Sequence, residues 1–445
     1  SDPSVTAAAL NTLNGKTSVD IIATAVTSIS GSAAEVKTLY AAVDDFVDLG
    51  SEAVTLSGST SVADANIVSA ATSGVVTATI SEGDLATLST LRNEVNAYTI
   101  TVTDETGVSA AALNTLNGKT SVDIIATAVT SISGSAAEVK TLYAAVDDFV
   151  DLGSEAVTIT DASTATLTAS LLSEIGAATT GNVTVTNALA VTGTADQMID
   201  AVVTPETRVV LNAASRLTVS DYSTQDLSGI AASFTLNVAL PDSDQTVSNG
   251  KLSTVDQLTV SAGKTLTIDS AATLTDLDRV VLNGENATLS MNQASRLRVA
   301  GLTSIQGTSA DGETVNIATS ASGAQAINLK QINDISGLDH LVIDADTSNA
   351  VLSVRLSETL SKSSAVQVVL DADTSANKDV VILESNLTGA TTGLTAYNDT
   401  TTWTQLGLGG VDIVNFVPNK DSFGVVDANN AFVLTNWRLG FCLLY

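Results

Sequence analysis

The chain has 445 residues, a net charge of −30, one histidine and one cysteine. It has 48 acidic residues and only 18 basic ones. This balance argues against a nucleic-acid partner because phosphate groups would be repelled. No apolar run is long enough to cross a lipid bilayer, and a single cysteine cannot form a disulfide within the chain. The composition therefore favours a secreted protein whose stability comes from the packing of aliphatic side chains.

The segment Ala7–Thr55 occurs a second time, residue for residue, as Ala110–Thr158, at an offset of 103 residues. A unit that can be copied whole and placed next in line makes most of its contacts with its neighbours. Strand-like patterns start at similar intervals along this unit, near Asp20, Ala53, Val75, Tyr98 and Asp123. The duplication therefore predicts a repeat architecture with four coils in each large repeat.

Strand-like and helix-like patterns alternate between the two copies. Val75–Ile80 alternates apolar and polar residues, as a half-buried strand does, and Tyr98–Thr103 does the same. Ser81 predicts the cap of an intervening helix. The apolar residues of this helix recur at helical spacing at Leu85, Leu88, Leu91 and Val95. Strand, helix and strand in this order predict parallel strands with right-handed crossovers.

The longest helix is expected inside the duplicated segment. Ser135–Glu138 has the sequence of a capping box, and Gly153 is a plausible stop. The spacing predicts a helix over Ala136–Asp151, with its copy over Ala33–Asp48. Its buried face would consist of Leu142, Val146 and Phe149, and of Leu39, Val43 and Phe46 in the copy.

The repeats diverge after Thr160, and the connections become shorter and richer in Ser, Asp and Gly. We therefore predict a right-handed parallel β-solenoid that has short helices in its N-terminal coils and becomes all-β toward the C-terminus. Residues 1–160 would form the α/β solenoid with the duplicated unit. Residues 161–388 would form β-helix-like repeats, and residues 389–445, where aromatic residues gather, a closing cap.

Two copies of Asp-Ala-Asp-Thr-Ser follow similar predicted strands, at residues 344–348 and 371–375. Such a turn can present two carboxylates to calcium, although neither copy has the glycine and glutamate of an EF-hand loop. Plain Asx turns that close a strand are the alternative. Calcium is the one small ligand that the sequence suggests, with these candidate ligands: Asp344, Asp346, Asp371, Asp373, Asp379 and Asp412.

The only histidine, His340, follows Asp339, and a Ser-His-Asp triad would have to use this pair. A simpler interpretation is that His340 is a polar residue opening the strand Leu341–Ile343. The sole cysteine, Cys442, is far from His340 in the sequence, and no phosphate-binding glycine loop is present. We therefore expect a protein that is not an enzyme. Two carboxylates that meet on neighbouring coils and cleave a polysaccharide remain an alternative.

Three blocks of the sequence resemble the repeats of very large surface proteins of cyanobacteria and other bacteria, of the S-layer and RTX-adhesin types. These blocks are Gly74–Ile80, Tyr98–Asp104 and Ser109–Leu116. Gly407–Val414 is similar to one RTX calcium nonapeptide, with Leu408 where a glycine belongs. The resemblance implies export by a type I-like route without an N-terminal signal, and a structural or adhesive role outside the cell.

These observations together predict an extracellular structural repeat protein, a stiff acidic rod that serves a surface layer or adhesion. Its expected partners are further copies of itself or neighbouring surface proteins, with polysaccharide as another partner. A virion appendage or fibre would use the same rod and is a second hypothesis. A polysaccharide-degrading β-helix enzyme is a third.

Overall fold

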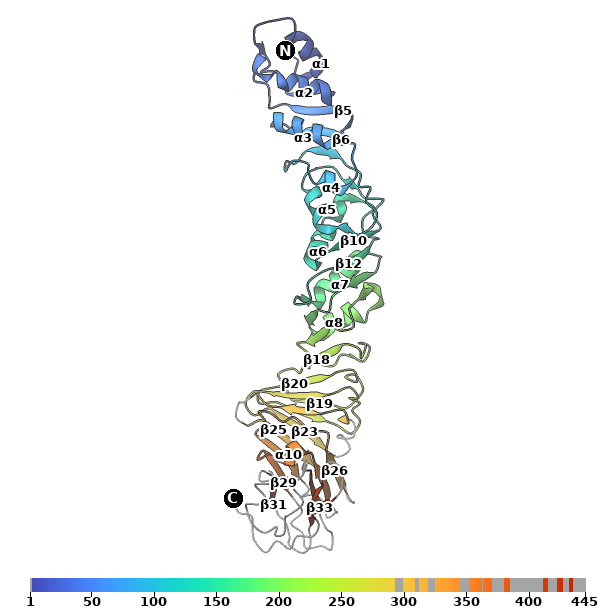
Figure 1. Ribbon diagram of the computed structural model, residues 1–445, viewed down its shortest axis with the longest axis vertical. Coiled ribbons are helices and arrows are strands. Elements are labelled where there is room, and N and C mark those ends of the chain that lie inside the picture. The colour runs from blue at the N-terminus through green and yellow to red at the C-terminus, as the bar shows by residue number, and fades with distance from the viewer. Residues whose placement is uncertain are drawn as a thin grey trace. The chain divides into compact units, whose positions relative to one another are not determined.

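The structure is a computed structural model, which describes residues 2–292, 299–308, 312–318, 325–344, 352–361, 363–369, 380–384, 411–414, 422–426 and 432–434. The chain divides into two compact units (Figure 1). The N-terminal unit comprises Ser1–Leu189 and Asp200–Asn212. The C-terminal unit comprises Ala190–Ile199 and Ala213–Tyr445.

Two five-stranded sheets of parallel strands form the N-terminal unit. The first sheet has the strand order β1 (Ser4–Thr6), β3 (Ser28–Ser32), β5 (Ala53–Thr60), β6 (Val76–Ile80) and β7 (Ala97–Thr99). The second has the order β8 (Val108–Ser109), β10 (Ser131–Gly134), β12 (Ala156–Ile159), β14 (Val183–Val185) and β16 (Val209–Val210). Neighbours in each sheet follow one another along the chain, but the first sheet contains β3 at Ser28 and not the strand expected near Asp20.

Short helices connect these strands, and neighbouring helices pack on one another. They are α1 (Ala7–Asn14), α2 (Ala33–Ala41), α3 (Val62–Ala71), α4 (Leu85–Leu88), α5 (Ala110–Asn117), α6 (Ala136–Ala144) and α7 (Ala169–Ala178). The helix α7 begins where β13 (Thr166–Thr168) ends, and α8 (Ala195–Val202) follows later. The predicted capping box is confirmed: the Ser135 side chain accepts from the amide of Glu138, whose carboxylate accepts from the Ser135 amide at 2.8 Å. The Ser32–Glu35 pair does the same in the first copy.

The two identical segments fold into the same elements at the same offset. The helix α2 corresponds to α6, and β2 (Ile21–Ile22) corresponds to β9 (Ile124–Ile125). Each of these strands pairs in parallel with a second short strand, β4 (Phe46–Val47) in the first copy and β11 (Phe149–Val150) in the second. One sequence therefore gives one local structure in two places of the chain.

The long helices predicted over Ala33–Asp48 and Ala136–Asp151 are wrong in length. The helix α6 ends at Ala144, a 3₁₀ turn (Val146–Asp148) follows, and Phe149 enters β11. Phe149 is buried as expected, but from a strand. Two aspartates at the negative end of the helix dipole disfavour continuation. Gly153 lies beyond the strand, in a turn with φ of +117°, and does not stop the helix.

Two further predictions about single elements need correction. Ser81 does not cap the following helix, because the side chain of Asp84 accepts from the amide of Thr87 instead. That helix, α4, ends at Leu88, so Val95 is not on a buried helical face and is 63% exposed. The prediction for Tyr98–Thr103 fares better, since Ile100 and Val102 are fully buried.

The C-terminal unit consists mainly of strands in parallel pairs. One row has the order β15 (Ala190–Gly193), β17 (Arg216–Val219), β18 (Thr235–Ala239), β20 (Gln257–Ser261), β22 (Arg279–Asn283) and β24 (Ser304–Gln306). A second has the order β19 (Gln245–Val247), β21 (Thr265–Ile268), β23 (Thr288–Asn292), β25 (Thr314–Ala318), β27 (His340–Asp344), β29 (Val366–Val369) and β31 (Asp412–Val414). A third has the order β26 (Gln325–Leu329), β28 (Leu352–Leu356), β30 (Val380–Glu384), β32 (Ser422–Val426) and β33 (Phe432–Leu434), in which the last pair is antiparallel.

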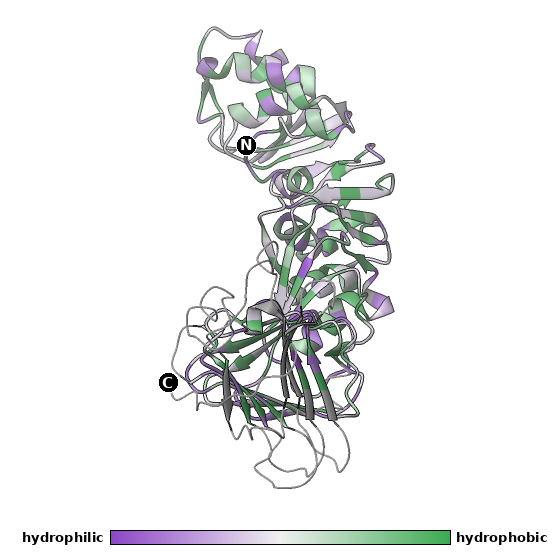
Figure 2. Cartoon of the chain, turned by 60° about the horizontal axis from the view of Figure 1, so that its bottom comes forward, coloured by the Kyte–Doolittle hydropathy of each residue, from purple (hydrophilic) through white to green (hydrophobic). Residues whose placement is uncertain are grey.

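Aliphatic side chains line up in columns across these strands. In the row from β21 to β29, pairing places the following fully buried residues side by side: Leu266, Leu289, Val315, Leu341 and Val366. Figure 2 shows the accompanying alternation of apolar and polar residues along the strands. Each such side chain contributes roughly 1.5–3 kcal/mol by its removal from water, so the columns are the core of this unit.

Helices persist further along the chain than the sequence suggested. Beyond Thr160, where turns were expected, the chain still forms α7 and α8. Past Val202 the described residues are mainly strands and turns, with the one-turn helix α10 (Glu358–Ser361) as an exception. The fold is therefore mostly parallel sheet, with helices concentrated in the N-terminal unit.

Candidate functional site

The structure describes only some of the predicted calcium ligands. Asp344 is the last residue of β27, and Asp412 is the first residue of β31. Their strands are separated by β29, where Asp344 pairs with Val369 and Asp412 with Gln367. The two are therefore not neighbours in the sheet. The other candidates lie outside the described residues: Asp346, Asp371, Asp373 and Asp379.

The strands β27 and β29 are nevertheless parallel neighbours, and in the sequence each is followed by an Asp-Ala-Asp-Thr-Ser segment. The first segment begins at Asp344, the last residue of β27, and the second begins two residues after Val369 in the sequence, outside the described residues. Within the described part of the chain, no group of three or more His, Cys, Asp or Glu residues could hold a metal ion.

His340 and its neighbour Asp339 occupy ordinary structural positions. His340 is exposed at the start of β27, opposite Thr314 of the neighbouring strand, so the prediction that it opens a strand is confirmed. The Asp339 carboxylate accepts from the amides of Gly312 and Glu313, at 2.6 and 3.1 Å. These hydrogen bonds lower the pKa of Asp339, and they commit its Oδ2 atom to the preceding coil.

Each copy of the duplicated segment contains one buried glutamate that the sequence analysis did not single out. Glu155 is 1% exposed, and its Oε2 atom accepts from the amide of Gly153 at 2.8 Å and from the hydroxyl of Tyr143 at 3.5 Å. Among the described residues, its Oε1 atom has no hydrogen-bond partner. Glu52, with Tyr40, repeats this arrangement. Burial and the adjacent carboxylate raise the pKa of Tyr40 to about 12.

A threonine and a glycine of the next coil close over each buried glutamate. The Thr179 hydroxyl donates to the Glu155 carbonyl oxygen at 2.8 Å and accepts from the Gly181 amide at 3.0 Å. Thr72 and Gly74 do the same at Glu52. A Cβ atom on either glycine would overlap the glutamate carbonyl group. This contact, which we call the threonine clamp, ties successive coils together.

A polar hollow of about 490 Å³ lies beside the first clamp. The guanidinium of Arg92 donates to Glu94 at 2.7 Å, and the Ser69 hydroxyl donates to the same carboxylate at 2.5 Å. These bonds lower the pKa of Glu94 to about 2, so it is anionic at neutral pH. Asn96 links the group to the sheet by donating to Ser69 and accepting from the Val76 amide. The charges of the hollow are paired with each other and do not resemble an acid and base held ready for catalysis.

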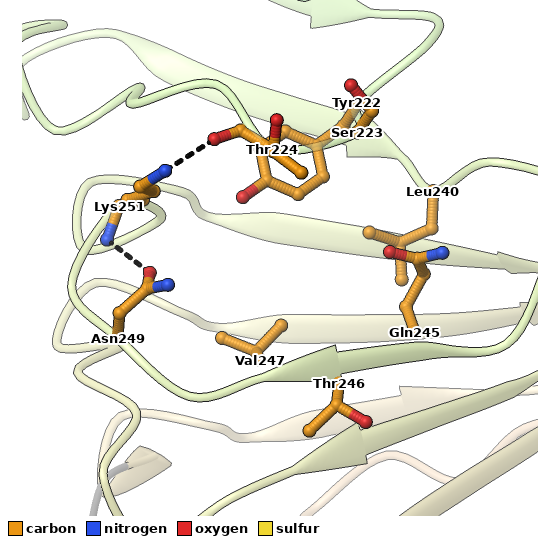
Figure 3. Close-up of a pocket in the computed structure, with 9 residues that line it drawn as sticks. All are labelled: Tyr222, Ser223, Thr224, Leu240, Gln245, Thr246, Val247, Asn249 and Lys251. Carbon is orange, nitrogen blue, oxygen red and sulfur yellow. Dashed lines mark hydrogen bonds between the residues drawn. The ribbon is translucent and has the colours of Figure 1, made fainter.

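A smaller pocket of about 130 Å³ lies in the C-terminal unit (Figure 3). Tyr222, Leu240 and Val247 supply apolar walls, and burial raises the pKa of Tyr222. The Lys251 ammonium donates to the Thr224 carbonyl oxygen at 2.6 Å. Pockets for organic ligands are usually several times larger, so this one suits a few water molecules at most.

No family model, no curated protein and no solved structure matches this chain. None of the helices that the structure describes has both the length and the apolar composition needed to span a lipid bilayer.

Proposed function

We propose that the chain is an extracellular structural repeat protein whose coils form a right-handed parallel solenoid, a stiff acidic rod for a surface layer or adhesion. The single observation that carries this proposal is the set of aliphatic columns, in which residues such as Leu289 and Leu341 stand in register across successive strands. A stack of this kind buries its core only between neighbouring coils. Adding coils therefore makes the molecule longer and leaves its width unchanged.

The contacts between coils support a mechanical role. In the threonine clamp, the polar groups form hydrogen bonds that join one coil to the next. The glycine lets the two backbones approach closely. The carboxylates of Glu94 and Asp339 are likewise engaged in holding neighbouring backbone or side chains. Groups used in this way stiffen a scaffold.

We include calcium in this proposal as the one small ligand. Acidic residues outnumber basic ones by 48 to 18, an imbalance that bound cations would relieve. The parallel pairing of β27 with β29, each followed in the sequence by an Asp-Ala-Asp-Thr-Ser segment, supports these segments as the site, because ligands from both would then meet. The sequence resemblance to surface-layer and adhesin repeats supports a location outside the cell.

Immunogold labelling of intact cells of the source organism tests the location, with an antibody raised against the purified chain. The proposal expects gold particles on the outer surface, and loss of surface layer or adhesion when the gene is deleted. Labelling confined to the cytoplasm would contradict it. Labelling confined to released virus particles would favour the fibre hypothesis instead.

A further inference from the structure

The duplicated segment has identical residues in two places, yet its surroundings differ. In the second copy, Leu116 is fully buried and Lys119 is 4% exposed. Their counterparts in the first copy are both exposed: Leu13, at 48%, and Lys16. Since the residues themselves are the same, the difference comes from what covers them.

The coil Asp84–Thr103 covers the second copy. The helix α4 packs against α5, and the Lys119 ammonium donates to the carbonyl oxygens of Ser89, at 2.9 Å, and Leu91. Burial lowers the pKa of Lys119 because it removes the ammonium group from water. The two carbonyl oxygens replace part of the lost hydration.

The backbone of the same coil extends the sheet of the second copy. The Ile125 amide donates to the Ile100 carbonyl oxygen at 3.0 Å, and the Val102 amide donates to the Ile125 carbonyl oxygen at 2.8 Å. The Thr120 hydroxyl donates to the Tyr98 carbonyl oxygen at 2.7 Å. The coil therefore fits this face through backbone pairing, a lysine contact and apolar packing together.

The first copy presents the same face without a cover among the described residues. Val19 is 74% exposed and Ile22 is 76% exposed, and in the described part of the chain β2 shares its sheet with β4 alone. An unpaired strand edge with exposed aliphatic side chains is a ready site for strand addition. We call this surface, formed by Leu13, Lys16, Val19 and Ile22, the open repeat face.

We propose that the open repeat face is a docking site for a polypeptide segment that presents a coil like Asp84–Thr103. Such a partner supplies carbonyl oxygens at the end of a helical turn for the Lys16 ammonium. It also supplies an extended segment with alternating apolar residues, like Tyr98, Ile100 and Val102, to pair with the free edge at Ile22. The chain's own Asp84–Thr103 coil is already engaged with the second copy, so a different segment with the same pattern must supply these contacts.

The test uses the full chain and a synthetic peptide of residues 84–106. Amide hydrogen exchange is followed at Ile22, with Ile125, which is already paired, as the internal reference. We expect saturable binding that slows exchange at Ile22 and at Ser18, the counterpart of Ser121, whose amide donates to the Asn96 carbonyl oxygen, and that leaves Ile125 unchanged. The variant Ile22→Asp should weaken binding by about tenfold or more, because it places a charge where the counterpart Ile125 is half-buried beneath the covering coil. Since Ile22 is exposed, this variant should fold normally.

Two controls keep the proposal falsifiable. A peptide with Ile100→Asp and Val102→Asp should not bind. The second control fuses residues 84–106 to the N-terminus of the chain through a flexible linker. Tethering raises the effective concentration of the peptide to about millimolar, so even a weakly binding peptide should occupy the face. Unchanged exchange at Ile22 with the tethered peptide would overturn the proposal. Protection that appears without any peptide and grows with protein concentration would identify a second copy as the occupant, and would overturn the proposed partner.

Discussion

The hydroxyl of Thr179 bridges two coils, because it donates to the Glu155 carbonyl oxygen at 2.8 Å and accepts from the Gly181 amide at 3.0 Å. The same bridge joins Thr72 to Glu52. The glutamates belong to the duplicated segment, whereas the threonines lie outside it. The segments that contain Thr72 and Thr179 differ in sequence, yet both form the same hydrogen bonds to the preceding coil.

Replacing Thr179 with valine should destabilise the N-terminal unit. Valine keeps the shape but leaves the buried Glu155 carbonyl group and the Gly181 amide without this partner, at a cost of about 1–3 kcal/mol. Thr179→Ser keeps the hydroxyl and should lose much less. Denaturant unfolding of both variants measures the difference. Equal losses for the two would show that the hydroxyl is unimportant.

The glycine of the clamp should tolerate no side chain. In Gly181→Ala the new Cβ would overlap the Glu155 carbonyl group, and the forced shift should cost roughly 1–3 kcal/mol. Gly118→Ala is the matched control, since its nearest neighbour is 3.6 Å away and its backbone is helical with φ of −69°. That change should be neutral or stabilise by about 0.4–1 kcal/mol. A neutral Gly181→Ala would contradict the close approach.

Stability should fall at high pH because of Tyr40. The pKa of Tyr40 is raised from 10.0 to about 12, first by burial and then by the nearby Glu52 carboxylate. The unfolded chain therefore loses the proton first, and stability that is complete below pH 10 is lost as the pH rises toward 12. Tyr40→Phe should reduce this loss. Chemical denaturation across the range, with phenolate absorbance recorded in parallel, provides the measurement.

Calcium should raise the melting temperature if the two Asp-Ala-Asp-Thr-Ser turns bind it. Saturating calcium should add about 1–3 kcal/mol relative to a chelator. The double variant Asp344→Asn with Asp346→Asn should lose this gain, whereas the exposed Asp123→Asn should keep it. Identical melting curves in calcium and chelator would remove calcium from the proposed function.

The regular alternation of apolar residues was enough to predict the parallel strands and the buried positions of Ile100 and Val102. It could not reveal β3 and β10, because Ser28–Ser32 contains a single large apolar residue, Ile29, and so has no visible period. The strand patterns near Asp20 and Asp123 were real, but β2 and β9 belong to separate short pairs.

The threonine clamp also escaped the sequence analysis, for a physical reason. Its partners are 20 and 24 residues apart, so they meet only through the register of the coils. A signal was nevertheless present. Both Thr72 and Thr179 follow the end of a helix, and each is followed two positions later by a glycine. Searching for recurring Thr-x-Gly after predicted helices would have found the clamp.

Small-angle X-ray scattering of the full chain tests the central claim, that stacked coils form a rod. A compact globular protein of 445 residues would have a radius of gyration of about 22 Å. The proposed rod predicts a clearly larger value, with a distance distribution that peaks early and declines almost linearly, because each coil adds about 4.8 Å along one axis. A radius near 22 Å with a symmetric distribution would contradict it.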